Sequence, residues 1–359
     1  MYCQKIIMNT SKYIQIVTRF NYIAANIWFL NQKKNIFLVY LQQINKIKKS
    51  FNNTKYSNQW KTLSQTKYFI VSGSFLFNLF NPKKEKDDIE ELKITIKRSI
   101  LLIQKKEFLK AEQMLHIALY QAQTLQHYDG ITYVYDIMAN LAYDMNDFEK
   151  AKDLFKSVLK RLIAKGVPQD DLAIIHISLK IADIYDKIGN IEKAVTGYKF
   201  CLEHLQNHLS KNNENQDALQ LLGLSSEKYA SMLFSQSQYA NALEYFIQAY
   251  DVCIKINGEE NEQTVILLNN LGSVCYMLQQ YDQTIKYFSK AAELGKKIPD
   301  MVDSGYININ LGNTFIAQGL YEEAKKSCSE GERLAKLQND NESIMEAKKC
   351  LEEIKRLIS

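Results

Sequence analysis

The chain has 359 residues, of which 46% are hydrophobic and 24% are charged, and its net charge is +5. This is enough to bury one large repeat array or two ordinary domains. The charge is uneven, because residues 1–84 hold thirteen Lys and Arg and no Asp or Glu, which leaves 32 basic and 40 acidic residues for the rest. A mildly acidic body without a dense basic stripe argues against nucleic-acid binding.

Residues 1–66 are predicted to be a mitochondrial targeting leader that is cleaved or stays disordered. Apolar residues recur every three or four positions near its start, with Lys12 and Arg19 beside them. A basic amphipathic N-terminus without acidic residues is typical of a mitochondrial transit peptide. A secretory signal fits less well, because no continuous apolar core precedes a small-residue cleavage site, and a plain basic tail is the remaining alternative.

Residues 67–86 are predicted to be a short membrane-associating segment with basic flanks. The apolar run from Tyr68 to Phe80 is thirteen residues long, which as a helix spans about 20 Å against a hydrocarbon core of about 30 Å. Four small or polar residues dilute it: Ser72, Gly73, Ser74 and Asn78. We expect contact with a membrane and leave open whether the run spans it. A processed or disordered segment is the main alternative, and core packing is the least favoured.

The three prolines, Pro82, Pro168 and Pro299, all fall between periodic segments, which favours an all-α body. Within that body a small residue on one predicted helix is followed twelve positions later by a second on the next helix. Small side chains let two antiparallel helices approach closely, while bulky neighbours fill the space beside the contact. The six repeat-packing pairs are Ser99 and Ala111, Ala139 and Ala151, Ala182 and Ala194, Ala230 and Ala242, Gly272 and Thr284, and Gly312 and Ala324.

This pattern resembles the tetratricopeptide repeat family, in which helical hairpins stack because one pair cannot bury its apolar face alone. The resemblance implies a right-handed solenoid of about six hairpins over residues 87–340, and the amphipathic stretch 341–359 is predicted to be a capping helix. The second small positions lie 40, 43, 48, 42 and 40 residues apart, which exceeds the usual ~34. We expect longer helices or links, such as the one where Gly166 ends a helix and Asp170 or Asp171 caps the next.

No residues point to catalysis, a cofactor or a small-molecule substrate. A Gly-rich phosphate loop and a Gly-x-Ser-x-Gly elbow are both missing from the sequence. His204 and His208 are one helical turn apart but have no third ligand in view, so no metal site is predicted. The six cysteines form no C-x-x-C pair, and we expect reduced thiols that pack as small core residues. The chain is therefore predicted to be a binding scaffold and not an enzyme.

In the tetratricopeptide repeat family the first helices line an inner wall, where asparagines hydrogen-bond the backbone of an extended peptide. By position, the resemblance assigns this role to Asn140, Asn270, Asn310 and Asn313. An amide suits a peptide unit because it donates and accepts at once. The alternative is that these are ordinary exposed polar residues. The Lys/Arg pattern of members that bind chaperone tails is missing here.

Several stretches, among them AEQMLHIALYQAQ and KGVPQDDLAIIHISLKIADIY, occur in an order similar to that of a mitochondrial group within this family. The resemblance implies a non-enzymatic protein of the mitochondrial inner membrane with its array facing the matrix. It would bind subunits of respiratory complex III, the cytochrome bc1 complex, and help to clear fragments of the Rieske iron–sulfur protein. The competing hypothesis is a cytosolic peptide or cargo adaptor similar to kinesin light chain, which leaves the acid-free leader without a use.

Overall fold

The structure is a computed structural model that describes residues 86–298, 301 and 303–359. The predicted leader and the apolar run Tyr68 to Phe80 lie outside these residues. Every regular element in the described part is an α-helix, which confirms the all-α prediction. Clustering of contacts places residues 86–200 in one compact unit, the N-terminal unit, and residues from Cys201 onward in a second, the C-terminal unit.

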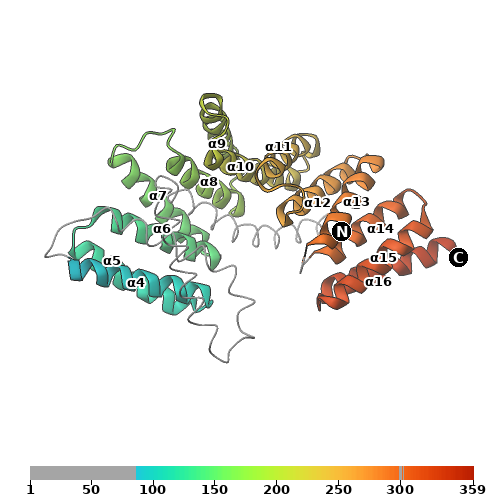
Figure 1. The fold of residues 1–359 in the computed structure, drawn as a ribbon, viewed down its shortest axis with the longest axis horizontal. Helices are drawn as coiled ribbons and strands as arrows, with labels where there is room; N and C mark the ends of the chain where they lie inside the picture. The colour runs from blue at the N-terminus through green and yellow to red at the C-terminus, as the bar shows by residue number, and fades with distance from the viewer. Residues whose placement is uncertain (1–85, 299–300, 302) are drawn as a thin grey trace. The chain divides into compact units, whose positions relative to one another are not determined.

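The helices alternate between a first and a second helix of each hairpin (Figure 1). The first helices are α4 (Lys86–Gln104), α6 (Tyr128–Asp144), α8 (Leu172–Lys187), α10 (Gln216–Ser235), α12 (Glu262–Met277) and α14 (Ser304–Ala317). The second helices are α5 (Phe108–Thr124), α7 (Phe148–Ala164), α9 (Ile191–Lys211), α11 (Tyr239–Asn257), α13 (Tyr281–Lys297) and α15 (Tyr321–Leu337). A last helix, α16 (Asn341–Ile358), packs on α15 and α14.

The turn inside each hairpin has the same construction. One residue adopts the left-handed conformation in each of the six turns: Lys106, Asn146, Gly189, Ser237, Gln279 and Gly319. In the first turn the Glu107 amide donates to the Leu102 carbonyl at 2.9 Å, which satisfies a carbonyl that the helix end leaves open. The link after α7 follows the prediction, since Gly166 is left-handed and the Asp171 carboxylate caps α8 by accepting from the Ala173 amide at 2.8 Å.

The twelve residues of the six small pairs are all buried. Two glycines show why size matters. A Cβ added to Gly272 would lie 2.5 Å from a ring carbon of Phe288, and one added to Gly312 would collide with the Cys328 sulfur. Bulky side chains therefore fill the space that the missing side chains leave, and larger residues at these positions would force the helices apart.

The alanines predicted to pack from the second helices have no exposed surface. Each of the four is 0% exposed: Ala151, Ala194, Ala242 and Ala324. Ala151 belongs to the same buried cluster as its partner Ala139, and the Ala324 carbonyl oxygen would lie 3.2 Å from a Cβ added to Gly312. A side chain that is fully buried cannot contact a partner protein. These alanines therefore lie inside the hairpins and are not part of any binding surface.

The cysteine prediction is wrong for one pair. Cys328 on α15 and Cys350 on α16 form a disulfide, with their Cα atoms 6.2 Å apart. They meet because α16 packs directly on α15, a contact that the spacing of cysteines in the sequence does not reveal. Cys201, Cys253 and Cys275 are free and buried, as expected, while Cys3 lies outside the described residues.

Candidate protein-binding face

Polar side chains join the first helices of neighbouring hairpins in the N-terminal unit. The Lys180 ammonium of α8 donates to the Asn140 side-chain oxygen of α6 at 2.9 Å and lies 3.8 Å from the Asp136 carboxylate. Burial lowers the pKa of Lys180, while Asp136 and Asp144 act in the opposite direction. This face of α6 and α8 thus carries carboxylates around one half-buried cation.

A second bridge joins the same two helices. The Tyr143 hydroxyl of α6 donates to the Asp183 carboxylate of α8, which also accepts from Tyr198 of α9 at 3.4 Å. Asp183 is buried, and burial together with the Asp183 charge holds the pKa of Tyr143 well above its usual value. Because a buried carboxylate needs such donors, Asp183 is a group that holds three helices together.

The C-terminal unit has its own bridges between first helices. Gln263 of α12 donates its amide to the Glu227 carboxylate of α10 at 2.9 Å, and Asn310 of α14 donates to the Asn269 side-chain oxygen of α12 at 3.0 Å. Glu227 is only 8% exposed, and burial raises its pKa to about 7. Apart from Glu262 at the start of α12, neither α12 nor α14 contains a charged residue. Their exposed polar groups are therefore mostly amides and hydroxyls.

The structure separates the four predicted asparagines. Asn140 is 7% exposed, and both ends of its amide are in use, by Lys180 and by the Asp136 carbonyl at 2.6 Å. Asn310 is engaged by Asn269. Asn270 and Asn313 are half-buried and make no side-chain hydrogen bond within the part of the chain that is described. Of the four, Asn270 and Asn313 are the two whose whole amide is available to a ligand, because neither end of it takes part in an internal hydrogen bond in the described residues.

The predicted asparagines also differ in register. Asn140 and Asn313 directly follow the small residues Ala139 and Gly312, whereas Asn270 and Asn310 come two positions before a small residue. The sequence reasoning missed Glu227, Gln263, Lys180 and Asp183 as bridging groups. The sequence did hold one signal for Glu227. Glu227 and Lys228 are the only two charged residues between Asp217 and Glu244. Glu227 also stands three positions before the small residue Ala230, so it lies near the buried side of the helix.

Comparison with known proteins decides the family. The family model of the tetratricopeptide repeat matches residues 217–297 and 265–336. A Drosophila melanogaster protein named tetratricopeptide repeat protein 19 homolog, mitochondrial, is 37% identical over 294 residues, which cover 81% of this chain and 80% of the fly protein. The human protein of that name is 31% identical over 271 residues, covering 73% and 71% of the two chains. The chain belongs to the tetratricopeptide repeat protein 19 family.

Solved structures agree with this family at the level of fold. A signal transduction ATPase of Pyrococcus horikoshii with a tetratricopeptide repeat sensor aligns with a TM-score of 0.56 and 17% identity, over 89% of this chain and 43% of that one. A Rap protein in complex with competence and sporulation factor aligns with a TM-score of 0.52 and 14% identity, over 96% and 97%. The predicted recognition and fold class are thus confirmed. Proteins built from these repeats are typically non-catalytic scaffolds.

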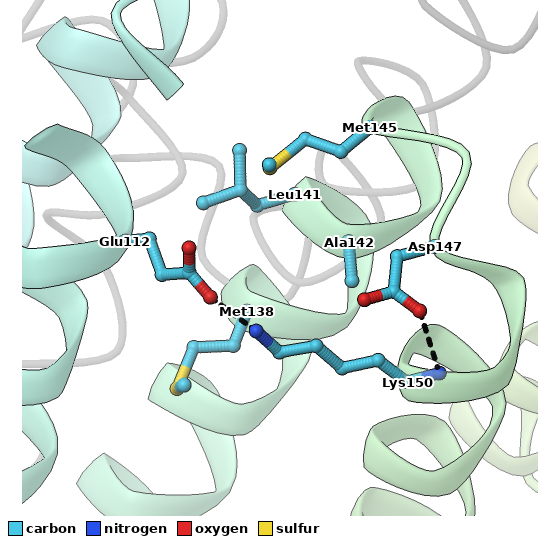
Figure 2. A pocket seen from close by; sticks show the side chains of 7 residues that line it. All are labelled: Glu112, Met138, Leu141, Ala142, Met145, Asp147 and Lys150. Carbon is cyan, nitrogen blue, oxygen red and sulfur yellow. Dashed lines mark hydrogen bonds and ion pairs between the residues drawn. The ribbon is translucent and has the colours of Figure 1, made fainter. Parts of the chain in front are cut away.

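The small pocket in Figure 2 lies in the N-terminal unit of this tetratricopeptide repeat protein 19 relative. The Glu112 carboxylate of α5 and the Lys150 ammonium of α7 pair at its edge, and Met138, Leu141 and Ala142 of α6 line it as well. Its volume is about 80 Å³, whereas small-molecule sites usually measure roughly 300–1,000 Å³. The pocket is a small gap beside an ion pair that joins two hairpins.

Residues 86–298, 301 and 303–359 contain no cluster of three His, Cys, Asp or Glu suited to a metal ion. In the same residues, none of the helices combines the length and apolar character that crossing a bilayer requires.

Proposed function

We propose that this protein is a non-enzymatic scaffold of the mitochondrial inner membrane that binds respiratory complex III and supports its maintenance. In this role it promotes the clearance of Rieske iron–sulfur protein fragments. The observation that carries the proposal is the 37% identity to a mitochondrial tetratricopeptide repeat protein 19 homolog over 81% of the chain. The similarity covers both compact units, so the proposal concerns the whole array.

The proposed location has independent support in the sequence. The first 84 residues contain thirteen basic and no acidic residues, as expected of a segment that is drawn across an energised membrane and contacts anionic lipid. The named fly and human relatives are both mitochondrial by name. We further propose that the array faces the matrix and that the apolar run Tyr68 to Phe80 attaches it to the membrane.

The proposed protein-binding surface is the first-helix face, with Asn140, Asn270, Asn310 and Asn313 as candidates. Asn270 and Asn313 are the strongest, because their amides make no hydrogen bond in the described part of the chain. A partner backbone can accept and donate hydrogen bonds there without loss of internal ones. Asn140 and Asn310 act as supports, since each already holds a neighbouring first helix.

The deciding experiment is crosslinking in isolated mitochondria that carry the tagged full-length chain in place of the native protein. We expect complex III subunits, including the Rieske protein, among the captured partners. The double variant Asn270→Lys, Asn313→Lys places two unpaired ammonium groups on the first-helix face and should reduce this capture about tenfold or more, as two lost hot-spot contacts would.

The matched control is Asn241→Lys, Gln283→Lys, which adds the same two charges on exposed positions of the second helices α11 and α13. It should leave capture unchanged. Both variants should keep the helical content of the parent. A partner set without complex III subunits would overturn the proposed function. Equal capture by the first-helix variant and its control would overturn the binding face.

A further inference from the structure

Three large apolar side chains are exposed on α4 and at the start of α5. Ile94 and Leu101 on α4 are 45% and 43% exposed, and Leu109 in the first turn of α5 is 71% exposed. Ile94 and Leu101 are seven residues apart, so they lie on one face of the helix. In Figure 1 these helices are the blue-green end of the described chain.

Basic residues lie within about one helical turn of Leu101 and Leu109, whereas Ile94 has Glu90 and Glu91 one turn before it and Lys97 and Arg98 one turn after it. Lys97 and Arg98 are exposed between Ile94 and Leu101, and Lys105 and Lys106 form the exposed turn that leads to Leu109. None of the four makes an ion pair within the residues that the structure describes. The carboxylate nearest in sequence to Lys105 and Lys106 is Glu107, which pairs with Lys110 at 2.7 Å, and the one nearest to Lys97 and Arg98 is Glu91, which accepts from Gln121 at 3.2 Å. We call these seven residues the end patch.

The last helix provides a contrast. It also exposes apolar side chains, with Met345 at 59% and Leu357 at 44%. Both α4 and α16 carry four acidic and four basic residues, but in α16 the two kinds are interspersed, whereas in α4 all four acidic residues precede Lys93. Exposed apolar groups are common to both helices. Residues 94–106 hold four basic and no acidic residues, and this local excess of positive charge distinguishes the end patch from α16.

The charge of the end patch discriminates between possible occupants. The preceding segment of this chain has basic flanks, Lys67, Lys83 and Lys84, and would be repelled. A second copy docked through the same patch would bring four positive charges against four. An anionic lipid surface is complementary, because headgroup phosphates attract the basic side chains while the apolar ones enter the interface.

The position in the chain points the same way. The apolar run ends at Phe80 and α4 begins at Lys86. Six residues span at most about 20 Å when fully extended. If the apolar run contacts a membrane, as in the proposed function, α4 is tethered within that distance of the lipid.

We propose that the end patch is a docking surface for an anionic lipid bilayer. Leu101 and Leu109 enter the interfacial region, and Lys97, Arg98, Lys105 and Lys106 contact phosphate headgroups. This contact would hold the N-terminal unit against the membrane as a second attachment beside the apolar run. The inference rests on the membrane location in the proposed function.

The test is amine acylation of the full-length chain, followed lysine by lysine by mass spectrometry. The chain is bound to vesicles of phosphatidylcholine alone or with about 30% phosphatidylglycerol, a typical anionic content. Labelling of Lys97, Lys105 and Lys106 should slow about fivefold or more on the anionic vesicles only. Lys348 and Lys355 on α16 should label at the same rate throughout. Equal rates for the end patch on both vesicles would overturn the proposal.

Variants then test the charge. Lys97→Glu, Arg98→Glu, Lys105→Glu should weaken binding of the full chain to anionic vesicles about tenfold or more. The control Lys348→Glu, Lys355→Glu, Arg356→Glu changes the charge equally and should have no such effect. The double variant Leu101→Gln, Leu109→Gln should also weaken binding, although it does not change the charge. It provides a second test of the end patch in case the charge-reversal variant does not fold. Equal binding by the first variant and its control would refute the lipid contact.

Two further outcomes separate the hypotheses. Protection of the end patch in isolated mitochondria but not on anionic vesicles would mean that a protein covers it, which overturns the lipid assignment. If the chain still captures complex III subunits but the end patch is not protected on anionic vesicles, only the lipid contact is overturned. Vesicle protection without capture would overturn the proposed function and leave the lipid contact standing.

Discussion

At the residue scale, contact between paired helices is set by side chains of minimal size. Ala182 of α8 is 1% exposed, and a Cβ added to Gly197 of α9 would lie 2.7 Å from the Ala182 Cβ. Two small residues thus face each other where α8 and α9 cross, with no free space for another carbon. The same principle applies at Gly272 beside Phe288.

Replacing Ala182 by Leu should therefore lower the free energy of unfolding by about 1–3 kcal/mol through overpacking. The control Ala164→Leu adds the same atoms at an exposed position of α7, where a change within about 0.5 kcal/mol is expected. Denaturant titrations followed by circular dichroism measure both. Equal midpoints for the two variants would contradict the tight contact between α8 and α9.

Glu227 should make stability depend on pH. Burial raises the pKa of Glu227 in the native state from 4.5 to about 7. Between pH 4.5 and pH 7 the native state therefore keeps a proton on Glu227 that the unfolded state has released. Stability contributed by this group is therefore full below about pH 4.5 and is lost as the pH rises to about 7.

Glu227→Gln keeps an oxygen that accepts from Gln263 but cannot ionise. We expect it to be more stable than the parent by about 1–3 kcal/mol at pH 8 and by little at pH 4.5. Thermal melts of both chains at the two pH values provide the measurement. A difference that is the same at pH 4.5 and pH 8 would show that Glu227 does not titrate in this range.

At the scale of elements, the connections depend on backbone conformation more than on residue type. Four of the six turns inside hairpins place a non-glycine residue in the left-handed region: Lys106, Asn146, Ser237 and Gln279. Only Gly189 and Gly319 carry the usual glycine signal of a helix end there. Asparagine tolerates this conformation, so packing of the paired helices imposes it on Lys106, Ser237 and Gln279, which do not favour it.

The last two helices are tied by the disulfide between Cys328 and Cys350, which closes a loop with a sequence separation of 22. Reduction should lower the free energy of unfolding by about 3 kcal/mol in the chain-entropy account and speed amide exchange in α16. The variant Cys328→Ala, Cys350→Ala serves as control, because a reductant should not destabilise it further. A reductant that destabilises parent and variant equally would exclude a role for this bond.

The redox state of Cys328 and Cys350 can also show which compartment the repeat array occupies. Disulfides persist in oxidising compartments and are rare where glutathione and thioredoxin keep thiols reduced. The redox state of Cys328 and Cys350 in intact mitochondria therefore depends on the side of the membrane that the array faces.

At the scale of the whole molecule, the charge separation along the chain is the dominant feature. The acid-free first 84 residues precede a body with an excess of eight acidic residues, 40 against 32. This separation fits the proposed roles of the two parts, a targeting and membrane-contacting segment followed by a protein-binding body.

Localisation should follow the leader. A tagged full-length chain is expected in mitochondria, and a chain that lacks residues 1–66 is expected to be diffuse in the cytosol. Imaging and fractionation of cells that express each form measure this. Cytosolic location of both forms would contradict the mitochondrial proposal and favour the adaptor hypothesis.

The sequence by itself determined the helical hairpins, the small positions and the family, because helical periodicity and a spacing of twelve are local properties of the chain. Only the tertiary structure decided which polar residues are in use. Asn140 and Lys180 are 40 positions apart, as are Tyr143 and Asp183, and such pairs meet only when hairpins stack. The availability of Asn270 and Asn313, the disulfide and the exposed end patch likewise depend on which surfaces the packing covers, and no periodicity encodes that.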